Sequence, residues 1–103
     1  MGFHRRLLAR PGRLVPLSAK GLRAGAVRLL PRGAMDWHST KHREELLISL
    51  AGCVSLEVQT SSALRRVSLR AGQSAFLPMN TRHRVVNRGS AVARYVYVTA
   101  PVR

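Results

Sequence analysis

The feature that most limits what this chain can form is the regular alternation of short apolar runs and turn residues over residues 24–100. In residues 53–59, for example, Val54, Leu56 and Val58 share one face, which we expect to be buried. Glycine, proline, asparagine and serine separate eight such segments, at 24–30, 34–38, 44–50, 53–59, 63–69, 74–77, 82–86 and 91–99. Short segments bounded by turn residues are typical of antiparallel strands.

Eight antiparallel strands predict an all-β fold, a double-sheet jelly roll or double-stranded β-helix, which leaves little exposed edge. The only helical candidate lies around residues 18–28, and Gly21 and Gly25 weaken it.

Length and charge set further limits. The 103 residues suit one domain and leave no room for two independent cores. There are 18 Lys and Arg against 4 Asp and Glu, a formal net charge of +14, so the chain should adhere to polyanions at low salt. Because the basic residues are scattered and only 5% of residues are aromatic, we interpret the charge as an arginine-rich surface and expect no nucleic-acid partner.

The N-terminal part differs from the rest in composition. It has no acidic residue before Asp36, whereas basic residues occur throughout it. We predict a basic, poorly ordered leader over residues 1–22 and a barrel domain over 23–103, with an organellar transit peptide as the alternative for the leader. Arg and Pro interrupt every apolar run, and none approaches the ~20 residues of a membrane span. Cys53 cannot form an internal disulfide, and we expect a cytoplasmic protein.

Two patches of the sequence contain side chains suited to metal binding. In the first, His38 and position 40 lie two apart, so both project to one face of a strand, and Glu45 opens the next strand. His83 lies in the second patch, on another strand, and closure of a barrel can bring all three side chains together. Imidazole nitrogen and carboxylate oxygen suit Fe, Mn, Ni, Co or Zn.

The two patches together resemble the two signature motifs of the cupin superfamily, in particular its small single-domain, cupin-2-like barrels. The second motif is matched at Gly72, Pro78, His83 and Asn87. Asn80 stands where the family usually has glycine, and asparagine tolerates the positive φ that this turn requires.

The first motif is matched at His38, Glu45 and Gly52. Gly33 is one residue closer to the histidine than in the family pattern. Thr40 occupies the place of the second histidine, so the four ligands of the family become at most three unless water or His42 contributes.

The resemblance implies a divalent transition metal (Fe, Mn, Ni or Zn) held by His38, Glu45 and His83. Glu44 is the alternative to Glu45 as the inward-facing carboxylate, and the six-residue gap to Gly52 favours Glu45. Further ligand-binding residues are predicted at Thr40, His42, Tyr95 and Tyr97.

The resemblance predicts the fold more directly than the activity, because one scaffold hosts many functions. One hypothesis is a metal-dependent protein, dioxygenase- or isomerase-like if it is an enzyme, that binds or transforms a small oxygenated metabolite. A second is a non-catalytic module that binds or senses a small molecule or sugar without metal, and either function would use an RmlC-like barrel. A third, polyanion binding, requires basic residues gathered on one face. The small core and the habit of the superfamily predict a homodimer.

Overall fold

The computed structural model describes residues 5–103, and these form two antiparallel sheets without any helix. No helix in this part of the chain is therefore available to cross a membrane. The strands are β1 (Gly12–Arg13), β2 (Arg23–Leu29), β3 (His38–Ser39), β4 (Arg43–Ala51), β5 (Cys53–Gln59), β6 (Leu64–Arg70), β7 (Ser74–Leu77), β8 (Arg82–Val86) and β9 (Ala93–Pro101).

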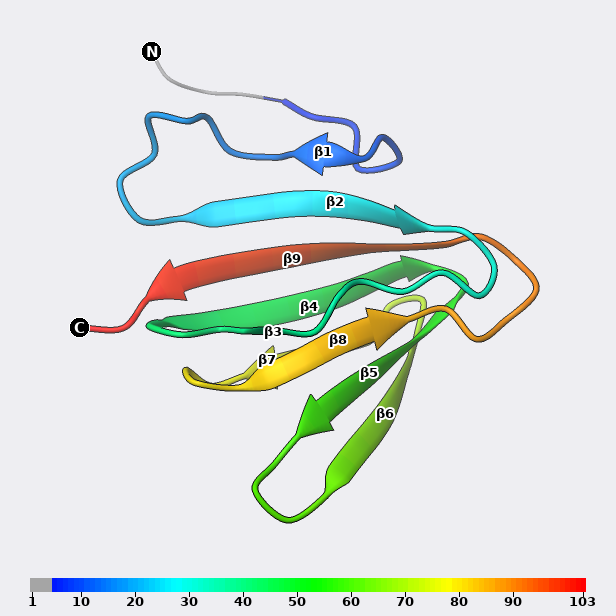
Figure 1. The fold of residues 1–103 in the computed structure, drawn as a ribbon. Helices are drawn as coiled ribbons and strands as arrows, with labels where there is room; N and C mark the ends of the chain where they lie inside the picture. Colours follow the sequence, from blue (N-terminus) through cyan, green and yellow to red (C-terminus); the bar gives the residue numbers. More distant parts are fainter. Residues whose placement is uncertain (1–4) are drawn as a thin grey trace.

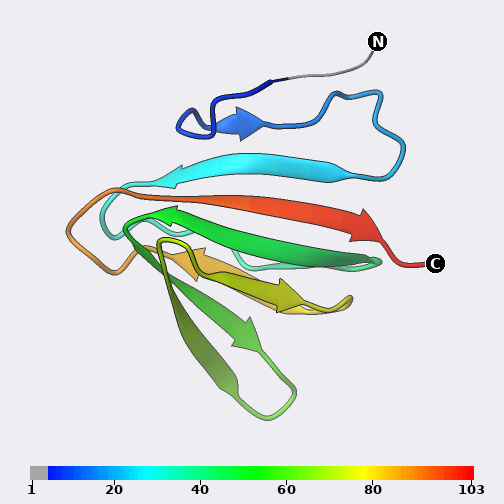
Figure 2. The same ribbon diagram turned by 180° about the vertical axis from the view of Figure 1, so that it is seen from behind.

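The larger sheet has the strand order β1-β2-β9-β4-β7, and the smaller sheet has the order β3-β8-β5-β6. Figure 1 shows β2, β9 and β4 lying side by side, with the β5–β6 hairpin extending away from them. The view from behind in Figure 2 shows β7 beside β4. The two sheets are hydrogen-bonded separately, so the barrel is formed by packing of their inner faces.

The core lies between the two sheets. It consists of inward-facing aliphatic residues from both, together with Tyr95: Leu29, Leu47, Val54, Leu56, Leu69, Leu77, Val85, Ala93 and Tyr95. Burial of Val54 and Leu56 follows the period-two alternation read from the sequence. The all-β prediction is thus confirmed.

The weak helical candidate around residues 18–28 is not a helix, and β2 pairs with β9 from Arg23 to Leu29, close to the strand expected at 24–30. The structure differs from the expected strands in two places. The expected strand 34–38 is reduced to the two residues of β3 and an isolated bridge from Ala34 to Val86. Strand β1, which pairs with β2, was not expected and lies within the proposed leader, of which residues 1–4 are outside the described part of the chain.

Two turns of the cupin-like motifs have the backbone that their residues allow. Asn80 has a φ of 55°, as expected for the asparagine that replaces glycine. Gly52 has a φ of 71°, and a Cβ there would lie 2.9 Å from the carbonyl oxygen of Val92. Only glycine meets both conditions without strain.

Candidate metal centre

His38, Glu45 and His83 come from three strands in the two sheets. His38 in β3 and His83 in β8 are directly paired across the smaller sheet, and their ring centroids are 4.3 Å apart. Glu45 lies in β4 of the larger sheet and is buried, whereas its neighbour Glu44 is exposed. One donor atom from each of His38, Glu45 and His83 lies within 4.8 Å of the others. The inward carboxylate is therefore Glu45.

Both histidine rings are oriented by backbone carbonyl groups. Nδ1 of His38 lies 2.9 Å from the carbonyl oxygen of Asp36, and Nδ1 of His83 lies 2.9 Å from that of Thr81. A carbonyl oxygen only accepts, so each Nδ1 carries the proton and donates it. In a neutral ring this leaves the Nε2 lone pair free, which is the arrangement of metal-bound histidines.

Nε2 of His83 is buried and has no hydrogen-bond partner. Its nearest charged neighbour is an oxygen of Glu45, at 3.7 Å, which is too long for a hydrogen bond. Burial lowers the pKa of His83, but the Glu45 carboxylate and the Thr81 carbonyl raise it more, so the net shift is upward. The nitrogen thus faces a negative oxygen across a gap, and both atoms suit a divalent cation.

Thr40 lies beside these residues, but its hydroxyl is used by the backbone. Oγ1 donates to the carbonyl oxygen of Pro78 at 2.8 Å and accepts from the amide of Thr81 at 2.9 Å. The Thr40 amide also donates to the Thr81 carbonyl, the same oxygen that accepts from His83. Thr40 therefore fixes the turn that orients the His83 ring.

A pocket of about 340 Å³ opens beside the three candidate ligands. It is also lined by Tyr95 and Tyr97 of β9 and by Thr40. Burial, followed by the charge of Glu45, raises the pKa of Tyr95, so its hydroxyl stays protonated. Tyr97 lies across Gly25 of β2, where an added Cβ would come within 2.6 Å of the Tyr97 hydroxyl oxygen. The absence of a side chain at residue 25 leaves the space for that ring.

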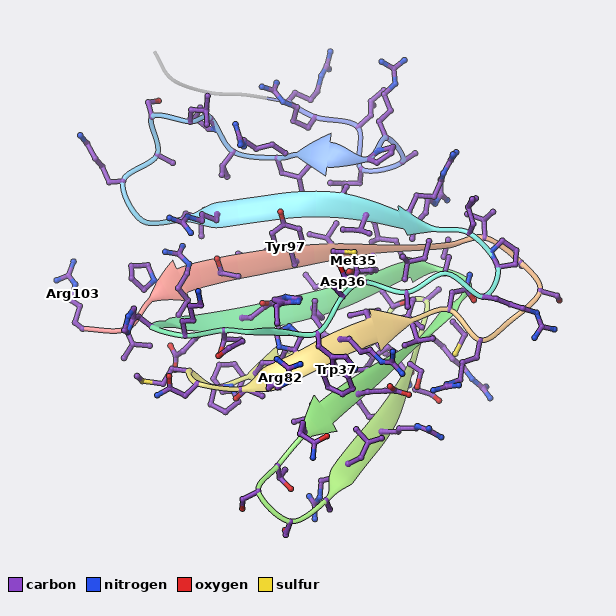
Figure 3. All side chains as sticks on the ribbon, in the orientation of Figure 1. Met35, Asp36, Trp37, Arg82, Tyr97 and Arg103 are labelled. Atoms are coloured by element: carbon purple, nitrogen blue, oxygen red, sulfur yellow. The ribbon has the colours of Figure 1, made fainter. Side chains whose placement is uncertain are left out.

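The predicted ligand-binding residue His42 and its neighbours Asp36 and Trp37 do not line this pocket. His42 is exposed in the turn before β4 and belongs to a neighbouring hollow. Asp36 is exposed at the end of the segment that leads to β3. Trp37 is half-buried against two arginines, with the guanidinium carbons of Arg82 and Arg84 at 5.6 and 5.0 Å from its ring centroid. Figure 3 shows Trp37 over β8 near Arg82, whereas Met35 lies close to Tyr97.

Sequence reasoning did not single out two arginines of the pocket, Arg23 and Arg43. A signal for Arg43 was present, because it lies two residues before Glu45 on the same strand and so faces the same way. Arg23 could not be placed without the register, which pairs it with Thr99 of β9.

The comparisons with known proteins agree with this architecture. The profile of the cupin domain family matches residues 25–99, and the chain belongs to this family. Its double-stranded β-helix fold and its single small cupin domain are those of the family. A comparison with curated protein sequences finds no significant match.

Several solved structures share the fold. A protein from Thermus thermophilus is 23% identical with a TM-score of 0.74, over 95% of this chain and 90% of that one. A cupin 2 conserved barrel domain protein from Salinispora arenicola is 24% identical with a TM-score of 0.72, over 90% and 76%. A recombinant oxalate oxidase in complex with glycolate is 21% identical with a TM-score of 0.72, over 79% of this chain but only 42% of that one. The chain thus spans less than half of the oxidase, and these likenesses concern the fold alone.

Proposed function

We propose that this chain is a metal-binding cupin that holds one divalent cation on His38, Glu45 and His83 and binds a small oxygenated molecule beside it. The observation that supports this most is the state of the two rings. Each gives its Nδ1 proton to a backbone carbonyl, and the buried Nε2 of His83 is left without a partner beside a carboxylate. Fe, Mn, Ni and Zn all accept this donor set.

A cation bound there would supply Lewis-acid polarisation of a ligand oxygen. The chain's own residues would bind and orient that ligand. Tyr95, with its raised pKa, is a hydrogen-bond donor rather than a base, and Tyr97 closes the side of the pocket next to β2. If the protein is an enzyme, this geometry favours metal-dependent oxygenation or isomerisation of a small oxygenated substrate.

The first prediction concerns metal content. We expect the purified protein, or the protein reconstituted with Fe²⁺, Mn²⁺, Ni²⁺ or Zn²⁺, to contain about one metal ion per chain by elemental analysis. The double variant His38→Ala, His83→Ala should lose it, because only Glu45 remains. His42→Ala is the matched control, since its ring is exposed and outside the cluster, and it should keep the metal.

Two outcomes would contradict the metal site: a parent that stays free of metal after reconstitution, or a double variant that keeps its metal. A metal-free parent that is still stabilised by small molecules would favour the alternative function, a non-catalytic small-molecule or sugar-binding module.

We also propose that the chain forms a homodimer through the outer face of the larger sheet. On this face Val98, Leu46 and Phe76 lie side by side across β9, β4 and β7, and Leu46 and Phe76 are 39% and 59% exposed. A second copy would remove this apolar stripe from water.

Polyanion binding is supported by one feature only. Arg66, Arg84 and Arg88 gather on the outer face of the smaller sheet, but all three contact the carboxylate of Glu57. This arrangement supports an internal ion-pair cluster at least as well as a surface for a partner.

A further inference from the structure

The opening of the pocket carries two positive charges, Arg23 and Arg43, and neither forms a salt bridge within residues 5–103. Arg23, Thr99 and Glu45 form one inward-facing row across β2, β9 and β4, because Thr99 is paired with both of the others. Arg43 faces the same way as Glu45, two residues before it. Both guanidinium groups therefore belong to the lining of the candidate metal pocket.

The two arginines differ in how many hydrogen bonds hold their side chains in place. Arg43 donates from Nε to the hydroxyl of Thr99 at 2.8 Å, and from Nη2 to the carbonyl oxygens of Thr99 and Gly21. Its orientation is thus fixed by the protein. Arg23 is exposed and makes no side-chain hydrogen bond within residues 5–103, so its planar fork remains free for a ligand.

None of the chain's acidic side chains pairs with either arginine. The sequence has only four Asp and Glu residues. Glu57 accepts from three arginines and Glu45 faces His83, while Asp36 and Glu44 are exposed and outside the pocket. Within residues 5–103 neither Arg23 nor Arg43 has an ion-pair partner.

We propose that Arg23 binds the carboxylate of a small organic anion, that Arg43 adds a fixed positive charge beside it, and that the ligand's remaining oxygens face His38, Glu45 and His83. This inference rests on the proposed function and narrows its ligand to the class of small carboxylates. A carboxylate fits the free fork of Arg23 and neutralises the charge at the opening. A neutral ligand of the same shape would leave both guanidinium groups without a counter-charge.

Binding of malonate and of its neutral diamide, malonamide, tests this, measured by isothermal titration calorimetry at constant ionic strength. The parent should bind malonate more tightly than malonamide, and Arg23→Gln should weaken malonate binding by about tenfold. Arg28→Gln is the matched control, because Arg28 lies on the same strand, is exposed and is outside the pocket. It should change the affinity by less than about twofold.

The metal content of the same samples separates this inference from the proposed function. A parent without metal that binds malonate through Arg23 would contradict the metal site and support the carboxylate site. A metal-loaded parent in which Arg23→Gln and Arg28→Gln bind malonate equally well would overturn the role of Arg23. Equal affinity for malonate and malonamide would overturn the carboxylate class, and both results would leave the metal site intact.

Discussion

Thr40 stands where the cupin motif has its second histidine, and its hydroxyl joins the end of β3 to the turn before β8. The side chain satisfies one donor and one acceptor of that turn, at Thr81 and Pro78. Because the Thr81 carbonyl accepts from Nδ1 of His83, the position of this turn sets the orientation of the ring. A residue in a ligand position of the motif thus positions another candidate ligand.

We therefore expect Thr40→Val to lower both stability and metal affinity. Valine keeps the shape but leaves the Thr81 amide and the Pro78 carbonyl without the hydroxyl, which should cost about 1–3 kcal/mol of unfolding free energy. Loss of orientation at His83 should weaken metal binding by roughly tenfold. Urea denaturation and metal titration would measure the two effects.

Thr40→Ser is the control for that variant, since it keeps the hydroxyl and should retain most of both properties. If valine and serine variants bound metal alike, Thr40 would have no part in positioning His83.

Among the strands, β5 contains a charged side chain, Glu57, that is fully buried. Glu57 is 0% exposed although it points outward from the sheet, because arginines cover it. It accepts from Nε of Arg84 at 2.6 Å and contacts Nε of Arg66 at 2.9 Å and the guanidinium of Arg88. These groups link β5 to both of its neighbours, β6 and β8, and to Arg88, two residues after the end of β8.

This cluster predicts a stability change in acid. Hydrogen bonds from Arg88 and Arg84 lower the pKa of Glu57 from 4.5 to about 2. Because the pKa of Glu57 is lower in the folded state than in the unfolded state, the ionised carboxylate stabilises the fold. This stabilisation is complete above about pH 5, and it is lost as the pH falls towards 2. In denaturant unfolding, Glu57→Gln should be less stable than the parent by about 1–3 kcal/mol at pH 7.

The difference between the Glu57→Gln variant and the parent should shrink below pH 4 and be mostly lost near pH 2, where about half of the folded parent molecules have a protonated Glu57 carboxyl. A difference that stays constant from pH 7 to pH 2 would show that packing rather than charge is responsible.

The sequence predicted the strands better than their contacts. Segments 53–59, 74–77 and 82–86 coincide with β5, β7 and β8, because period-two alternation and turn residues are local properties. The motif residues His38, Glu45 and His83 were also found, and the structure brings them together. Burial of Glu57 was not predictable, since it depends on the register that places Arg66 and Arg84 opposite it. The position of Arg23 in the pocket was not predictable for the same reason, because it depends on the pairing of β2 with β9.

For the whole molecule, the net charge of +14 predicts weak adhesion to any polyanion. We expect binding to single-stranded DNA at about 50 mM salt to be largely lost at about 200 mM, because the attraction comes from counterion release. Fluorescence anisotropy across this range would measure it. The control is Glu57→Gln, which frees Arg66, Arg84 and Arg88 and should strengthen binding at low salt. Binding by the parent that persists at high salt would put the polyanion function ahead of the small-molecule one.

The larger sheet also makes a prediction for the whole molecule. Its outer face presents Leu46 and Phe76 beside Val98, and a chain of 103 residues gains stability if a second copy covers this stripe. We expect a dimer by light scattering, and a monomer for Leu46→Glu, Phe76→Glu, because the introduced charges would be buried against apolar residues. Leu64→Glu is the control, since Leu64 is 45% exposed but lies on β6 of the other sheet, and this variant should remain dimeric.

A parent that is strictly monomeric at all concentrations would contradict the proposed dimer. A double variant that stays dimeric would place the contact on another face of the molecule.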